Sequence, residues 1–242
     1  MKRLVFPTLS IITAVLLAYA LYQALVVAPT DALQGDVYRI IYYHVPSAWT
    51  AFLLFLINFV ASVVYLIWRS PKADIVAVVS AEVGVVFCTI VLVTGPIWAR
   101  PVWGIWWAPG DIRLTSTLVL WLIYVSYLVL RRFSTSAQTQ MLAAALAVFG
   151  ALDVPLVYFS IWFFRTQHPQ PVIGGGGSMD PRMLHTLLIS WLAFLCFAFL
   201  ICWSRFRLER LKRDVDEAHA MESLVGAGGS AKASMPLNRS SQ

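Results

Sequence analysis

The sequence contains little charge and none of the common motifs of soluble hydrolases. Charged residues make up 12% of the 242 residues, about half of the share in soluble domains. There is no Walker A, HExxH or GxSxG motif, so the sequence predicts no ATP hydrolysis, zinc-peptidase or serine-hydrolase activity of its own. The three cysteines form no CxxC pair and no zinc spacing. The net charge of +6 comes mainly from residues at the ends of apolar runs, which does not indicate a nucleic-acid partner.

Hydrophobic residues are abundant instead, at 60% of the chain with a mean hydropathy of +0.75. A helix needs roughly 20 apolar residues to cross the hydrocarbon core of a membrane. Six windows meet this requirement: Leu4–Ala28, Ser47–Trp68, Ile75–Trp98, Thr115–Leu130, Met141–Phe163 and Leu184–Trp203. We therefore predict an all-α polytopic membrane protein with six transmembrane helices in one domain, residues 1–213.

The distribution of Lys and Arg predicts the orientation of these helices. Six spans place both termini on one side, and eleven Lys and Arg residues near span ends lie on that side, against five arginines on the other. By the positive-inside rule, both termini are cytoplasmic. The outer loops are then about 29–46, 99–114 and 164–183, and they contain Arg39, Arg100, Arg113, Arg165 and Arg182. Residues 214–242, polar and rich in Gly and Ser, are predicted to form a disordered cytoplasmic tail.

Two acidic residues fall inside predicted spans, Glu82 in the third and Asp153 in the fifth. Ionisable side chains at membrane depth are expensive and mark functional sites by default, although an inter-helix hydrogen bond is the simpler interpretation. Asp153 is followed by Val154 and Pro155, which predicts a local distortion of the fifth helix.

Three histidines lie on the predicted outer side. His44 precedes Val45 and Pro46, and because the residue before a proline disfavours helix, we expect a chain bend there. His168 precedes Pro169 just beyond the fifth span. His185, at the start of the last span, is an alternative to His168.

The second outer loop contains an unusual aromatic cluster, Trp103, Trp106 and Trp107, followed by Asp111 and Arg113. Such a cluster predicts a flat platform for a flat, largely apolar ligand. Asp111 directly precedes a span, where an aspartate is a good helix N-cap. Two imidazoles can occupy both axial positions of a haem iron, indoles can stack on the porphyrin, and arginines can pair with its propionates. The residues therefore favour a haem site on the outer face.

The motif from Trp103 to Trp107, followed by Asp111 to Ser116, resembles the tryptophan-rich "WWD" signature of membrane haem-handling proteins. Over residues 1–213 the chain resembles the cytochrome c maturation protein C (CcmC) family, including the motif His44-Val45-Pro46. The usual pattern is W-G-x-W-W-x-W-D-x-R; here the stretch before Asp111 is one residue longer and lacks the last tryptophan.

This resemblance implies a function and a set of site residues. The family traffics haem b in cytochrome c biogenesis at the periplasmic face of the bacterial inner membrane, and presents it to the haem chaperone CcmE. Its partners are the small membrane protein CcmD and the ATP-binding cassette transporter CcmA–CcmB. The resemblance assigns the axial positions to His44 and His168, the signature loop to Trp103, Trp106, Trp107 and Asp111, and the arginines near haem to Arg39 and Arg113.

Two other functions remain open from the residues. A b-type redox cytochrome normally carries its histidines at helical spacing inside spans, and no histidine here lies deep in one. A cofactor-free transporter permease finds its best support in Glu82 and Asp153.

Overall fold

The computed structural model describes residues 2–134, 136–164, 166–171 and 179–233, so the predicted outer arginine Arg165 and the glycines 174–177 lie outside the described residues. The helices follow one another along the chain as α1 (Lys2–Tyr22), the π-helix η1 (Gln23–Val27), the 3₁₀-helix η2 (Asp36–Ile40), α2 (Ile41–Trp68), α3 (Pro71–Trp103), α4 (Ile112–Phe133), α5 (Ala137–Ala151), α6 (Asp153–Phe163) and α7 (Pro181–Ala233). The described part of the chain contains no β-strand.

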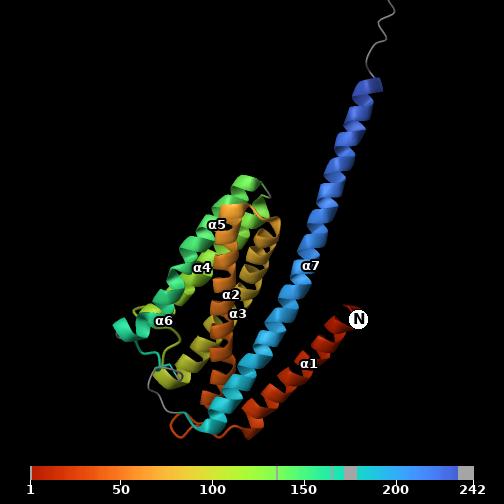
Figure 1. The fold of residues 1–242 in the computed structure, drawn as a ribbon. Coiled ribbons are helices and arrows are strands. Elements are labelled where there is room, and N and C mark those ends of the chain that lie inside the picture. Colours follow the sequence, from red (N-terminus) through yellow and green to blue (C-terminus); the bar gives the residue numbers. More distant parts are fainter. Residues whose placement is uncertain (1, 135, 165, 172–178, 234–242) are drawn as a thin grey trace, which may run out of the picture.

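Six helical segments are long and apolar enough to cross a membrane, which confirms the predicted all-α fold with six spans. Figure 1 shows α2 to α6 gathered in one bundle, with α7 and α1 beside it. We call the end where α2, α4 and α7 begin the histidine end, and the opposite end, where α1 begins, the terminal end. α1 packs mainly on α7, as in the edge-to-face contact of Phe6 with Trp203 (centroids 6.1 Å apart), and leaves most of its apolar surface exposed.

The centre of the bundle is held by close contact among α2, α3 and α4. The ring of Phe55 on α2 stacks on that of Tyr124 on α4, with centroids 3.9 Å apart and planes 10° apart. Gly84 of α3 makes room for this pair, because a Cβ there would lie 2.7 Å from Cε1 of Phe55. Small residues at helix contacts let backbones approach closely in membrane proteins, where packing replaces the hydrophobic effect.

The predicted bend before Pro46 is wrong, because α2 already begins at Ile41 and Pro46 lies within it. A proline blocks one hydrogen bond, to the carbonyl four residues earlier. In α2 the carbonyl of Tyr42 therefore lacks this partner, and the helix continues past it. His44 is therefore held on the first turn of a helix. α3 likewise runs on to Trp103, so that the second loop shortens from the predicted 99–114 to 104–111.

The predicted distortion of the fifth span is confirmed. The span is divided into α5 and α6 at Leu152, whose backbone N–H bonds to the carbonyl of Phe149 in a tighter turn. Pro155 lies in the first turn of α6, where its missing N–H costs least.

At the terminal end, acidic residues join α7 to the bundle. Asp74 of α3, only 3% exposed, accepts from Arg131 of α4 at 2.6 Å and from Arg213 of α7 at 2.8 Å. Glu82 has a partner that the sequence did not reveal: Arg205 donates to both its carboxylate oxygens, at 2.8 and 2.7 Å. This fixes α7 against α3, and it gives Glu82 a structural role.

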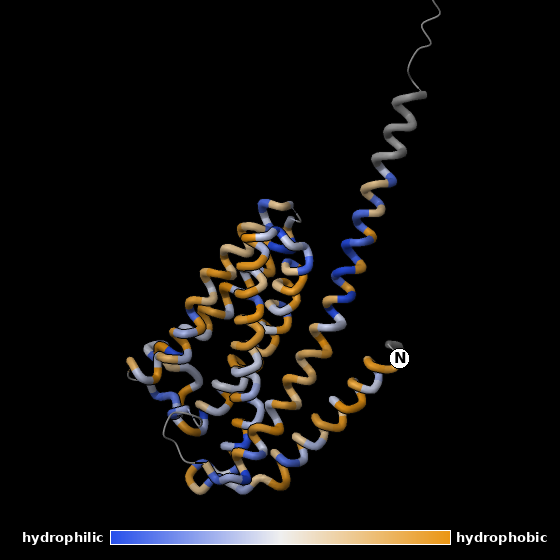
Figure 2. Tube along the Cα trace, viewed as in Figure 1, coloured by the Kyte–Doolittle hydropathy of each residue, from blue (hydrophilic) through white to orange (hydrophobic). Residues whose placement is uncertain are grey.

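α7 continues past Arg213, where the disordered tail was predicted to begin, up to Ala233. Figure 2 shows α7 changing along its length from mostly hydrophobic to mostly hydrophilic residues. Ion pairs at helical spacing, Arg213 with Glu209 at 3.2 Å and Arg210 with Asp214 at 4.0 Å, favour helix there without burial of apolar surface. The part of the predicted tail from 234 to 242 lies outside the described residues.

Candidate functional site

The structure brings His44 and His168 together at the histidine end, although they are 124 positions apart in the sequence. Their ring centroids are 6.3 Å apart, and the ring planes differ by 32°. His44 is carried by the first turn of α2, and His168 by the segment that follows α6. Both side chains are half-buried, so each is screened by protein on one side and open on another.

The separation of the two rings is that of two imidazoles bound to opposite faces of one metal ion. A metal–imidazole bond is about 2 Å long. The nitrogen lies about 1.2 Å from the centre of a five-membered ring with bonds of about 1.35 Å. Two rings on one axis through a metal ion thus have centroids about 6.4 Å apart, close to the observed distance.

The Nδ1 atom of each ring has a partner. Nδ1 of His44 lies 2.8 Å from Oγ1 of Thr94 on α3, and Nδ1 of His168 lies 3.0 Å from the carbonyl oxygen of Pro169. In the described part of the chain, no hydrogen bond reaches Nε2 of either histidine. A metal-bound histidine typically uses its other nitrogen in this way, so Nε2 is the candidate ligand atom in both rings.

The donor set also fits iron in a porphyrin. Within the described ranges, no group of three or more His, Cys, Asp and Glu side chains lies together as a metal cluster. Two imidazoles alone suit a metal ion whose other four positions are already filled, as they are in haem.

Arg113, in the first turn of α4, lies beside the histidines and has an unused donor. Its charge is close enough to act on both imidazoles. Its Nη1 is buried without a hydrogen-bond partner among the described residues. A buried, unpaired guanidinium donor is costly, and a carboxylate is the group that matches its geometry. A propionate of haem would be such a carboxylate.

Asp111 joins the second loop to the segment that carries His168. Its Oδ1 accepts from the backbone N–H groups of Arg113 (3.0 Å) and Leu114 (3.2 Å), which confirms the predicted N-cap of α4. Its Oδ2 accepts from the hydroxyl of Thr166 (2.5 Å) and from the backbone N–H of Gln167 (2.8 Å). The carboxylate thus fixes the chain directly before His168 to the start of α4.

The local environment keeps Asp111 charged and His168 neutral. Burial would raise the pKa of Asp111, but the hydrogen bonds from Thr166, Gln167 and the two cap N–H groups outweigh it and lower that pKa below its ordinary value. Burial and the nearby Arg113 lower the pKa of His168 to about 4. The neutral imidazole, which is the form that binds a metal, is therefore favoured at neutral pH.

The tryptophans lie at the end of α3 and in the loop after it. Trp103 packs edge-to-face on Trp98 with centroids 4.9 Å apart, and Nε1 of Trp98 donates to Oε1 of Gln34 in the first loop at 2.8 Å. Trp107 is half-buried, whereas Trp106 is 59% exposed. Gly104, at φ +77°, reverses the chain direction after Trp103, a conformation that favours glycine. The indoles are thus accessible to a ligand at the histidine end.

Two other candidate residues are occupied or lie apart from the imidazole pair. Arg39 donates from Nη1 to the carbonyls of Ala24 (2.8 Å) and Ala28 (3.0 Å) and forms an ion pair with Asp36 at 2.8 Å, so it closes the end of the first span. His185 is exposed on α7, and no described contact joins it to His44 or His168.

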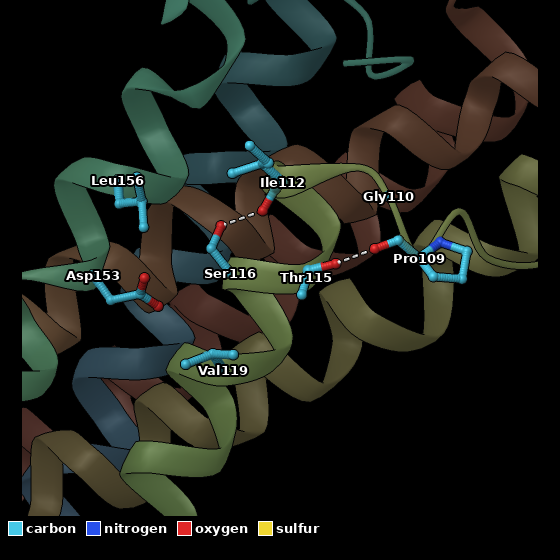
Figure 3. A pocket seen from close by; sticks show the side chains of 8 residues that line it. All are labelled: Pro109, Gly110, Ile112, Thr115, Ser116, Val119, Asp153 and Leu156. Atoms are coloured by element: carbon cyan, nitrogen blue, oxygen red, sulfur yellow. Dashed lines mark hydrogen bonds between the residues drawn. The ribbon is translucent and has the colours of Figure 1, made fainter. Parts of the chain in front are cut away.

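A cavity of about 310 Å³ lies beside the second loop, between α4 and α6. Figure 3 shows Asp153 and Leu156 of α6 facing Ser116 and Val119 of α4 across it. Neither histidine and none of the three tryptophans lines the cavity, so it is separate from the imidazole pair. Oδ2 of Asp153 is buried and has no partner among the described residues.

Sequence reasoning missed the residues that support the site: Thr94, Gln34 and Thr166. Each is a common polar residue with no motif around it. Their partners lie 50 to 64 positions away, so only the tertiary arrangement reveals them.

Comparison with known proteins identifies one family that this chain resembles over most of its length. Residues 1–221 match the family model described as heme exporter protein C. The heme exporter protein C of Bradyrhizobium diazoefficiens is 36% identical over 222 residues, which cover 90% of this chain and 84% of that protein. The protein of the same name from Escherichia coli K12 is 34% identical over 202 residues, covering 83% and 82%. That of Haemophilus influenzae is 32% identical over 211 residues, covering 86% and 85%.

Proposed function

We propose that this chain, which belongs to the heme exporter protein C family, holds haem b between His44 and His168 and presents it for transfer during cytochrome c biogenesis. The family handles haem in cytochrome c biogenesis, and six apolar helices make the chain a multi-pass membrane protein. Haem is here the cargo that the protein binds and releases.

One observation carries the proposal: two imidazoles with centroids 6.3 Å apart, each bonded through Nδ1 and free at Nε2. Bound haem supplies an iron with two open axial positions. His44, on a helix, provides a rigid ligand. His168, on a segment held by Asp111, provides a ligand that can move away when this segment is released.

The other residues position the porphyrin. Arg113 provides a buried cation for a propionate, and Trp103, Trp106 and Trp107 provide flat apolar surfaces. The exposure of Trp106 leaves one edge of the site open, which suits handing the cargo to another protein. Arg39 contributes indirectly in this account, because it holds the end of the first span beside η2.

The setting follows from the family resemblance and the charge distribution. We infer that the histidine end faces the periplasm, that both termini are cytoplasmic and that the membrane is the bacterial inner membrane. The haem chaperone CcmE is the acceptor, and CcmD and the transporter CcmA–CcmB are the partners in the complex. Since the chain has no Walker A motif, work from ATP must come from such a partner.

Purification of the protein and titration with haem test this proposal. The wild type is expected to give a Soret band of stoichiometric haem, and His44→Ala with His168→Ala together should abolish or strongly shift it. His185→Ala is the matched control, because His185 is an exposed histidine at the same end of the bundle. An unchanged spectrum in the double variant would exclude these two residues as the ligands.

A further inference from the structure

Thr94 is the nearest polar partner of His44, and it comes from a different helix. Its Oγ1 lies 2.8 Å from Nδ1 of His44, and on the other side 2.7 Å from the carbonyl oxygen of Ile90 one turn earlier in α3. The ring of His44 also lies close to the neighbouring Gly95, where a Cβ would be 3.5 Å from Cε1. The imidazole therefore packs directly against the backbone of α3 at this point.

The positions of the hydrogens follow from these two distances. Two oxygens 2.7 Å apart share a hydrogen, and between a hydroxyl and a backbone carbonyl only the hydroxyl has one to give. The single hydrogen of Thr94 is therefore donated to Ile90. Its oxygen can then only accept from His44, so Nδ1 of His44 carries the ring proton and Nε2 carries the lone pair.

We infer that Thr94 is a positioning residue for haem, which fixes the tautomer and the orientation of His44 so that Nε2 is presented to iron. This inference rests on the proposed binding of haem by His44 and His168. An acceptor on the distal nitrogen of a metal-bound histidine orients the ring and raises its basicity, and loss of such a partner typically lowers metal affinity 10- to 100-fold.

The two proposed ligands are supported in different ways. Nδ1 of His168 lies 3.0 Å from a backbone carbonyl, which can only accept and cannot be removed by substitution. His44 depends on a side chain, so its support can be altered without changing either ligand. The pair thus offers a clean test of the orienting bond.

The experiment compares Thr94→Val, which keeps the shape and removes the acceptor, with Thr94→Ser, which keeps the acceptor. Ser80→Ala is the matched control: Ser80 is on the same helix, and among the described residues its hydroxyl bonds only to backbone carbonyls of that helix. Each variant is purified, and its haem affinity, Soret spectrum and haem reduction potential are measured. These readouts respond to the iron ligand rather than to the overall fold.

Thr94→Val is expected to bind haem about tenfold more weakly. Its reduction potential should shift to a more positive value, because a less basic imidazole stabilises ferric iron less. Thr94→Ser and Ser80→Ala should match the wild type. If Thr94→Val has the wild-type affinity and potential while His44→Ala loses the spectrum, the inference about Thr94 is wrong and the haem site stands. If His44→Ala also leaves the spectrum unchanged, the proposed function itself fails. Equal loss in all three variants would mean a general packing effect and would also overturn the inference.

Discussion

Asp111→Asn should release the segment that carries His168 while leaving the helix cap in place. The carboxylate accepts two cap bonds through Oδ1 and two bonds from residues 166 and 167 through Oδ2. An asparagine has one acceptor oxygen and one NH₂ group. The NH₂ group can donate to the hydroxyl of Thr166 but cannot accept from the N–H of Gln167, so the oxygen stays with the two cap N–H groups.

The size of the effect follows from the bond that is lost. A hydrogen bond to a charged acceptor contributes about 1.5–3 kcal/mol. Its loss should lower the equilibrium constant between the bound and the released states of the segment that carries His168 by a factor of about 10 to 100. Because haem binding needs His168 in place, the apparent affinity for haem should fall by at most the same factor.

Hydrogen exchange at the amide of Gln167, measured in the haem-free protein, reports release of the segment directly, and haem titration reports its consequence. Asp180→Asn is the control. Asp180 also accepts from a backbone N–H at the start of a helix, that of Arg182 in α7, but it makes no described bond to the segment that carries His168. Faster exchange at Gln167 in Asp111→Asn alone is the expected result. Wild-type exchange and wild-type haem affinity in this variant would refute the role of Asp111 in holding His168.

Three further predictions concern other parts of the molecule. Because burial lowers the pKa of His168 to about 4, its imidazole in the haem-free protein should stay neutral as pH falls from 6.5 to about 4, and NMR titration should find its midpoint near 4. Over this range the unfolded chain binds the proton first, so the contribution of His168 to stability should fall as pH falls. Arg113→Ala should weaken haem binding about tenfold in a Soret titration. The dimethyl ester of haem, which lacks propionate charges, should bind the wild type and Arg113→Ala equally. A tenfold difference in affinity for the ester would exclude the propionate contact. Asp74→Ala should destabilise the protein by about 3–5 kcal/mol in thermal unfolding in detergent, since it leaves Arg131 buried without its partner, yet leave the Soret spectrum of the folded protein unchanged.

The spans were predictable from the sequence because an apolar window of about 20 residues needs a membrane whatever its neighbours are. The break at Leu152 was predictable for a similar reason, since Pro155 cannot continue a helix through its own N–H. The same rule failed at Pro46. There the loss of one bond, to the carbonyl of Tyr42, did not end the helix, which extends back past His44.

The supporting residues of the site were not predictable, because they act across helices. The bond of Thr94 to His44 depends on the register between α2 and α3, and the bonds of Asp111 to Thr166 and Gln167 depend on how two loops meet. Arg39 illustrates the converse. An arginine in an outer loop suggested a propionate partner, but four oxygens of its own loop and helix end already occupy its guanidinium.

The coordination of iron in the purified protein tests the central claim most directly. Electron paramagnetic resonance of the oxidised, haem-loaded protein distinguishes an iron with two imidazole ligands from one with a single ligand. We predict a low-spin ferric signal in the wild type, and a high-spin signal in both His44→Ala and His168→Ala. A high-spin signal in the wild type, or a low-spin signal that survives removal of both histidines, would contradict the account.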